Sequence, residues 1–160
     1  MVEIDIQQIC LNGHQMTDSC ANHPEFKHDF CPKCGEPTIT SCQECKASIP
    51  GHIYREFIMN SSLKAVPSFC TSCGKPYPWT KKRIKNFHEL TDELDELTPE
   101  ERNLLNRSLD ELIQDSPKSD VASLRFKKIA SKLRHDSYDL VKNVATDLLS
   151  ETLKKAIFGH

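Results

Sequence analysis

The second half of the chain has almost no glycine and no cysteine. No glycine occurs between Lys75 and Phe158, and no cysteine follows Cys73. Glycine marks turns and positions with positive φ, so its absence over this length excludes a loop-rich or turn-rich structure there. Apolar residues recur in this half at steps of three and four, which indicates helices.

Long apolar runs and an excess of one charge are also missing. No stretch approaches the roughly eighteen apolar residues of a transmembrane helix, so we expect no membrane-spanning segment. The first residues, MVEIDIQQIC, have neither a basic start nor an apolar run, so we expect no signal peptide and a cytoplasmic location. The formal net charge of −2 does not by itself indicate a polyanionic partner.

Cysteine and proline are concentrated in the first half. All eight cysteines and seven of the nine prolines precede residue 79. This change of composition predicts two domains, a double zinc-ribbon domain over 1–78 with short β-hairpins and a helical domain over 79–160. The fold class expected is therefore α+β, with an all-α C-terminal region after a small metal-binding module.

The helical half can be divided by its capping signals. Thr80 is placed to cap a first helix, and Thr98-Pro99-Glu100-Glu101 is a capping box with proline at the first helical position. The pattern predicts about four helices, over 80–97, 99–114, 119–134 and 136–158. Their apolar stripes fit a small bundle, although the stripe of the last helix could instead face a partner or a second copy. That stripe consists of Val141, Val144, Ala145, Leu148, Leu149, Thr152 and Ala156.

Six of the eight cysteines form Cys-x-x-Cys pairs, the usual spacing of a metal-binding knuckle. A reducing cytosol disfavours disulfides, so we interpret the pairs as ligands of zinc. One zinc ribbon is supplied by Cys42, Cys45, Cys70 and Cys73, with the strand-like segment GHIYREFIM between its two knuckles.

The knuckle of Cys31 and Cys34 needs two further ligands. Cys10 and His14 flank Asn-Gly, which suits a tight turn with positive φ, whereas the alternative pair, Cys20 and His23, lies close to Cys31 and contains no glycine. We favour the first pair and interpret Cys20 as a spare thiol. We expect His23, His28 and His52 on solvated loops.

Two ways of sharing the eight ligands remain open. A sequential arrangement gives one ion Cys10, His14, Cys31 and Cys34, and gives the other ion the two later knuckles. A cross-braced arrangement would interleave them; the spacing favours the sequential one. Four protein ligands leave no position for an activated water, so both zinc ions are expected to be structural. The chain also lacks a phosphate-binding glycine loop and a nucleophile elbow, so we predict that it is not an enzyme.

The segments CLNGH, FCPKCGEPTITSCQECKASIPG, FCTSCGKPYPWT and SETLKKAIFG together resemble the bacterial proteins grouped as domain-of-unknown-function family 2321. The resemblance covers nearly the whole chain. It implies a bacterial or phage origin, a double zinc ribbon followed by helices, and Cys10 with His14 as the first ligand pair. Members of that family do not generally carry a cysteine at the position of Cys20. The resemblance implies no activity.

Two kinds of function follow as hypotheses. The first is a non-enzymatic adaptor or regulatory protein that binds a protein partner, with a homo-oligomer through the C-terminal helix as a further possibility. In this reading Tyr77 and Trp79 pack between the two domains or anchor a partner. The second is nucleic-acid binding through the basic residues near 81–85 and 125–134. The ribbon half carries more acidic than basic residues, which favours the adaptor.

Overall fold

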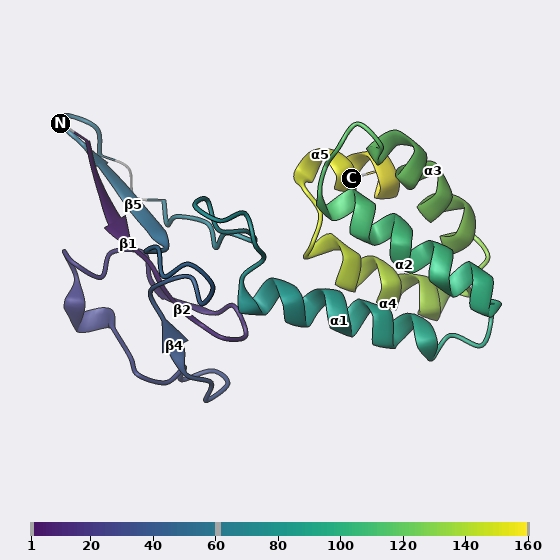
Figure 1. Cartoon of the computed structure of the whole chain (residues 1–160), viewed down its shortest axis with the longest axis horizontal. Helices are drawn as coiled ribbons and strands as arrows, with labels where there is room; N and C mark the ends of the chain where they lie inside the picture. The colour runs from purple at the N-terminus through teal and green to yellow at the C-terminus, as the bar shows by residue number, and fades with distance from the viewer. Residues whose placement is uncertain (1, 60–61, 160) are drawn as a thin grey trace. The chain divides into compact units, whose positions relative to one another are not determined.

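The computed structural model describes residues 2–59 and 62–159, and it confirms the α+β class. The chain divides into two compact units, Met1–Lys82 and Arg83–His160, each with its own hydrophobic core. The sequence pattern predicts the boundary between the domains after residue 78. Helix α1 (Pro78–Asp92) crosses the division, so its first turn belongs to the first unit (Figure 1).

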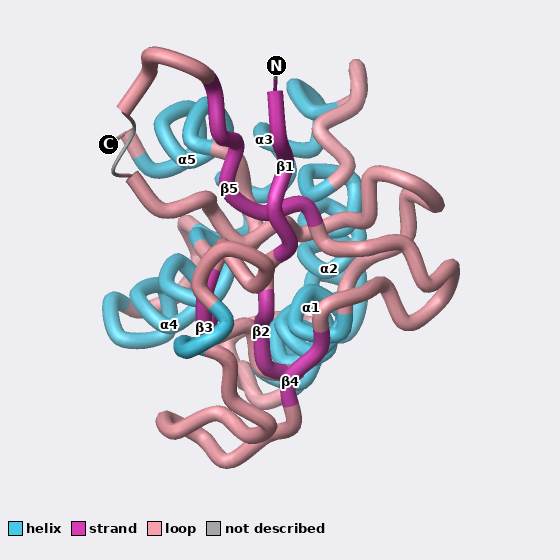
Figure 2. The backbone as a smooth tube through the Cα atoms, turned by 90° about the vertical axis from the view of Figure 1, so that its left-hand side faces the viewer, coloured by secondary structure: helices cyan, strands magenta, loops and turns pink. Residues whose placement is uncertain are grey.

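The first unit is built from two small antiparallel sheets. Strand β1 (Val2–Ile6) pairs with β5 (Pro50–Arg55), and the three-stranded sheet has the order β3-β2-β4. In that sheet β2 spans Gln8–Cys10, β3 spans Gln15–Thr17 and β4 spans Thr38–Ile39. A short 3-10 helix covers Pro24–Phe26. The strands are short and much of the remaining chain is loop (Figure 2), as expected for a unit with many prolines and few apolar residues.

The core of this unit is small, and it contains the aromatic residues that precede and begin α1. Tyr77 and Trp79 are buried with their rings stacked 4.8 Å apart, next to Ile9 and Ile49. The indole N–H of Trp79 donates to the Pro67 carbonyl at 2.8 Å. These aromatic side chains are therefore neither exposed nor free to anchor a partner.

Polar side chains hold β5 against the preceding segment that contains Asp18 and Ser19. The Nδ1 atom of His52 lies 3.3 Å from the Asp18 carboxylate, which also accepts the Lys64 backbone N–H. The Tyr54 hydroxyl donates to Ser19. The expectation that His52 lies on a solvated loop is therefore wrong, whereas His23 and His28 are exposed as expected.

Gly51 is required where β5 passes the backbone of Asp18. A Cβ atom at residue 51 would lie 2.2 Å from the Asp18 carbonyl oxygen and under 3 Å from backbone atoms of Ile6 and Asp5. Backbone atoms cannot rotate away, so we expect Gly51→Ala to destabilise the first unit by about 3 kcal/mol. Denaturant unfolding followed by Trp79 fluorescence measures this change. An unaltered midpoint would contradict the close approach.

The second unit is entirely helical. After α1, the helices are α2 (Pro99–Ile113), α3 (Ser119–Ala130), α4 (His135–Thr146) and α5 (Glu151–Phe158). Their core includes Phe87, Leu109, Phe126 and Val141, all buried. Among the described residues no helix is long and apolar enough to cross a membrane.

Two predicted helix boundaries are wrong. Helix α1 ends at Asp92 instead of residue 97, although Leu94 and Leu97 remain buried in the core. Thr80 does not cap this helix; it lies within it and donates its hydroxyl proton to the Ser68 carbonyl. The helix begins instead at Pro78, a position at which the backbone N–H that proline lacks would have no hydrogen-bond partner within the helix.

The predicted helix over 136–158 is two helices. The hydroxyl of Ser150 accepts the Leu153 N–H and caps α5, and Gly159 ends α5 with φ of 78°. After the break a different set of residues of α5 faces the core. Leu153 and Ile157 are buried, whereas Thr152 and Ala156, which were predicted to face inward, are exposed. The apolar face of α5 packs in its own unit and is not left for a second copy.

The capping box before α2 is confirmed. The Thr98 hydroxyl accepts the Glu101 N–H, and the Glu101 carboxylate accepts the Thr98 N–H. We expect Thr98→Ala to lower the free energy of unfolding of the helical unit by about 1 kcal/mol, because one N–H loses its partner. Thermal unfolding followed by circular dichroism tests this, with Thr98→Ser as the control that retains the cap.

Candidate metal centres

Each Cys-x-x-Cys pair lies in the same kind of backbone turn. The N–H of the first cysteine donates to the carbonyl five residues later, and that cysteine's carbonyl accepts the N–H of the residue four positions on. Short antiparallel bridges close the three turns, Phe30 with Pro37, Ser41 with Ser48 and Phe69 with Pro76. The repeated geometry explains why the two-residue spacing is sufficient to bring both sulfurs of a pair to one side of the turn.

The turn requires a positive φ directly after the second cysteine of each pair. Gly35 and Gly74 occupy this position with φ of 76° and 73°, but Lys46 occupies it in the middle pair with φ of 65°. A side chain in this conformation costs roughly 1–2 kcal/mol, part of which glycine returns through its greater freedom in the unfolded chain.

We therefore expect Lys46→Gly to raise the stability of the metal-loaded first unit by about 0.5 kcal/mol. Lys46→Ala is the matched control, because it removes the same long side chain and keeps the strain. Denaturant midpoints of the two variants give the comparison, and a Lys46→Gly variant less stable than Lys46→Ala would contradict the argument.

The turn before the first pair of cysteines is shorter. Cys10 donates its N–H to the His14 carbonyl and accepts the Gly13 N–H, each at 2.9 Å. Gly13 has φ of 94°, as the Asn-Gly dipeptide predicts. The turn directs the Cys10 sulfur and the His14 Nδ1 atom to within 3.4 Å of one another.

The structure brings the eight proposed ligands together in two clusters. One contains Cys10, His14, Cys31 and Cys34, and the other contains Cys42, Cys45, Cys70 and Cys73. Within each cluster the candidate ligand atoms all lie within 4.8 Å of one another. This grouping is the sequential one and not the cross-braced one. Cys20 belongs to neither cluster and its thiol is half-buried.

The distances between the ligand atoms fit a tetrahedral ion. Zinc bonds of about 2.3 Å to sulfur and about 2.0 Å to nitrogen give sulfur–sulfur edges of about 3.8 Å and sulfur–nitrogen edges of about 3.5 Å. The observed sulfur pairs lie at 3.7 Å (Cys10 and Cys34), 3.8 Å (Cys42 and Cys73) and 3.7 Å (Cys45 and Cys70). His14 Nδ1 lies 3.5 Å from the Cys31 sulfur. A disulfide would need about 2.05 Å, so all the cysteines are free thiols.

Backbone amides prepare several sulfurs for the thiolate form that a metal binds. The N–H of Glu36 lowers the pKa of Cys34 to about 6, and the N–H groups of Cys73 and Ser72 lower the pKa of Cys70 to about 6. Burial raises the pKa of Cys10, against the N–H of His14 that donates to its sulfur at 3.3 Å. Both clusters thus combine soft donors with N–H groups that stabilise negative charge.

The comparison with known protein families agrees with this geometry. A family model described as "Uncharacterized protein conserved in bacteria (DUF2321)" matches residues 3–157. The chain belongs to this family. The match covers both the ribbon-like clusters and the helices, which confirms the resemblance over nearly the whole chain. No curated protein and no solved structure matches the chain.

Proposed function

We propose that the protein is a non-enzymatic adaptor or regulatory protein, in which two structural zinc ions hold a protein-binding module of the reducing cytoplasm. The donor chemistry supports zinc, because three thiolates with an imidazole, and four thiolates, are its usual structural sets. Within the described residues, each cluster has four ligands and no fifth acidic or histidine side chain. A set of four protein ligands holds an ion without an open position for substrate.

The observation that carries the choice between adaptor and nucleic-acid binder is the pairing of the basic residues. Most cations in the two basic runs already contact a carboxylate. In 81–85 the pairs are Lys81 with Glu44, Lys82 with Glu36 and Lys85 with Glu89. In 125–134 they are Arg125 with Glu111, Lys132 with Glu101 and Arg134 with Glu96. A phosphate backbone would have to displace these carboxylates.

Few cations of the two basic runs remain available to bind the phosphate groups of a nucleic acid. In the two runs, as far as the chain is described, Arg83, Lys127 and Lys128 have no ion-pair partner. Two zinc ions with seven thiolates would add a net charge of about −3 to a first unit whose eight basic and eight acidic residues otherwise balance. The alternative, nucleic-acid binding through the runs near 81–85 and 125–134, is therefore the weaker proposal.

Fluorescence anisotropy distinguishes the adaptor proposal from the nucleic-acid alternative. The metal-loaded protein is titrated against labelled single- and double-stranded DNA and RNA, first at low and then at physiological salt. The adaptor proposal expects no binding at physiological salt, and the same result with Lys127→Gln/Lys128→Gln. Binding at physiological salt that weakens steeply as salt is added, and is lost in this double variant, would overturn it.

A protein partner is sought in parallel by affinity purification from bacterial extract, with and without nuclease treatment. A partner should be retained by the metal-loaded protein and lost when the first unit is stripped of metal. Retention that disappears on nuclease treatment would instead support the nucleic-acid alternative.

A further inference from the structure

The helical unit contains a small cavity where the ends of three helices meet. The cavity has a volume of about 210 Å³ and is lined by the last turns of α3 and α5 and the first turn of α4. Its buried lining is apolar and includes Phe126, Ala130 and Ile157, whereas Lys127 and Ser131 line it from exposed positions. An apolar cavity of roughly 150 Å³ in another protein is large enough to hold benzene. This cavity is therefore large enough for a single aromatic ring.

Three aromatic side chains contribute to the lining. The ring of Phe158 meets that of Phe126 edge to face, with centroids 6.0 Å apart and an angle of 84° between the rings. It meets the ring of Tyr138 in the same way, at 6.4 Å and 80°. Aromatic rings favour this geometry with one another, so a bound aromatic ring can pack in the same manner. Aromatic walls also bind quaternary ammonium cations, which are the competing class of ligand.

The cations beside the cavity favour the aromatic ring over the ammonium group. The Lys142 ammonium already lies over the Phe158 ring, 5.7 Å from its centroid. Lys127 lines the cavity, and among the described residues neither lysine has an ion-pair partner. A cationic ligand would be repelled by these two charges, whereas an anionic group can pair with Lys127 without displacing a carboxylate.

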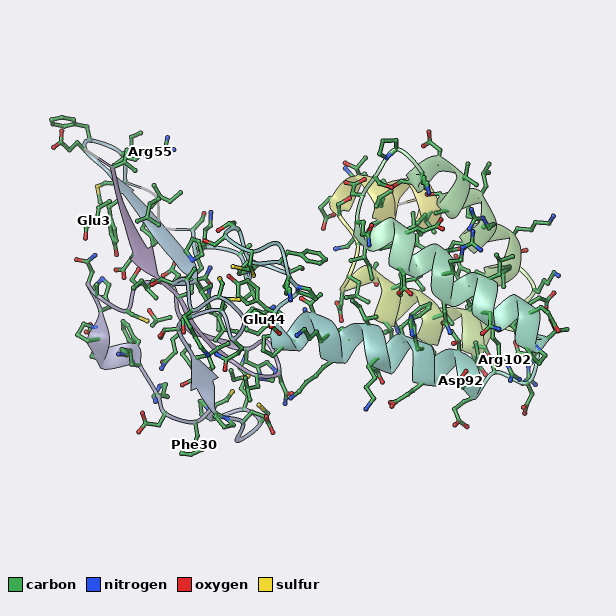
Figure 3. The ribbon with its side chains drawn as sticks, viewed as in Figure 1. Glu3, Phe30, Glu44, Arg55, Asp92 and Arg102 are labelled. Atoms are coloured by element: carbon green, nitrogen blue, oxygen red, sulfur yellow. The ribbon has the colours of Figure 1, made fainter. Side chains whose placement is uncertain are left out.

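The acidic side chains of the unit do not offset these cations at the cavity. Asp136 and Asp139 lie on the same helix as Tyr138 but are exposed and do not line the cavity. Asp139 lies 3.4 Å from His135. Asp92 lies at the far end of α1, away from α5 (Figure 3). The ligand that fits the lining is therefore apolar and aromatic at one end and negatively charged at the other.

We propose that the cavity between α3, α4 and α5 binds a small aromatic carboxylate, whose ring lies among Phe126, Tyr138 and Phe158 and whose carboxylate pairs with the Lys127 ammonium. A ligand of about ten non-hydrogen atoms should bind with a dissociation constant on the order of 1 mM. The site lies within the helical unit and uses none of the candidate metal ligands. It does not depend on the adaptor proposal, and either can fail alone.

A nuclear magnetic resonance titration of the ¹⁵N-labelled, metal-loaded protein with phenylacetate tests the proposal. The amide resonances of Ala130, Ser131 and Phe158 should shift and saturate, while those of Asp92 and Arg102, at the other end of the unit, stay in place (Figure 3). Phenylacetamide keeps the ring and loses the charge, so it should bind about threefold more weakly, as expected for the loss of one exposed ion pair. Choline should leave these resonances unchanged.

Two variants locate the ligand. Ala130→Leu extends a side chain into the cavity and should weaken binding by roughly tenfold or more, with circular dichroism as the check that the helices remain folded. Lys127→Gln removes an exposed charge, so it should weaken phenylacetate binding about threefold and leave phenylacetamide binding unchanged. The matched control is Lys128→Gln, the same change at an exposed lysine that does not line the cavity, which should leave both affinities unchanged.

Three results would overturn this site. The first is the absence of saturable shifts at about 10 mM phenylacetate, ten times the expected dissociation constant. The second is binding of choline in place of phenylacetate, because the cavity would then be a cation site. The third is a phenylacetate affinity that is the same in the parent, Lys127→Gln and Lys128→Gln, a comparison that holds even where Ala130→Leu fails to fold.

Discussion

Chelation of the metal at neutral pH is expected to unfold the unit Met1–Lys82 and to leave the helical unit folded. The core of the first unit has six buried members, of which Cys42 and Cys70 are themselves candidate ligands. A module with so little apolar surface depends on metal binding, which contributes about 10 kcal/mol or more per structural zinc ion at neutral pH. The helical unit has seventeen buried core residues and no candidate metal cluster among its described residues.

Two optical signals separate the units. Trp79 is the only tryptophan and is buried in the core of the first unit, so its emission should shift to the red when metal is removed. Far-ultraviolet circular dichroism should keep most of its helical signal, because α2 to α5 lie in the second unit. Unchanged Trp79 emission after complete removal of metal would contradict the account.

Cys70→Ser is expected to abolish one metal site and leave the other. Its sulfur lies 3.7 Å from that of Cys45, and its side chain is buried in the same core as Trp79. Serine is a poor zinc ligand because its hydroxyl stays protonated at neutral pH, so the bound metal should fall from two equivalents to one. The lost binding energy should unfold part of the first unit, visible as a red shift of Trp79 emission.

Cys20→Ser is the matched control. It makes the same chemical change at a cysteine outside both clusters, so it should retain two equivalents of metal and native Trp79 emission. A Cys20→Ser variant that lost metal, or a Cys70→Ser variant that retained both equivalents, would show that the ligands have been assigned wrongly.

The arrangement of the candidate ligands could be predicted from sequence because it depends on local geometry. A Cys-x-x-Cys turn places both sulfurs on one side whatever surrounds it, and Asn12-Gly13 makes the turn that joins Cys10 to His14. The capping box at Thr98 was predictable for the same reason, since both partners lie within three residues. That the eight residues bind zinc stays a prediction.

The features that could not be predicted from the sequence depend on contacts between segments that are far apart in the chain. His52 and Asp18 are thirty-four positions apart, and only the course of β5 beside the Asp18 backbone brings them together. A run of apolar and aromatic residues that includes Phe57 is also typical of a buried strand, but β5 ends at Arg55. Phe57 lies in the turn that follows, which the Ile58 N–H closes by donating to the Arg55 carbonyl, and its side chain is exposed.

The break between α4 and α5 had a local signal that the apolar periodicity concealed. Ser150 followed by Glu151 is an N-cap with an acidic first turn, but apolar residues continue on both sides of it. Packing decides between one helix and two. With the break, Leu153 and Ile157 enter the core; an unbroken helix would have presented Thr152 and Ala156.

Elemental analysis of the protein, expressed and purified without added metal or chelator, tests the central claim most directly. We expect two equivalents of zinc per chain and seven thiols, those of all cysteines except Cys20, that react with a thiol reagent only after denaturation with chelator. Zinc well below two equivalents, iron in its place, or a disulfide within any Cys-x-x-Cys pair would contradict the account.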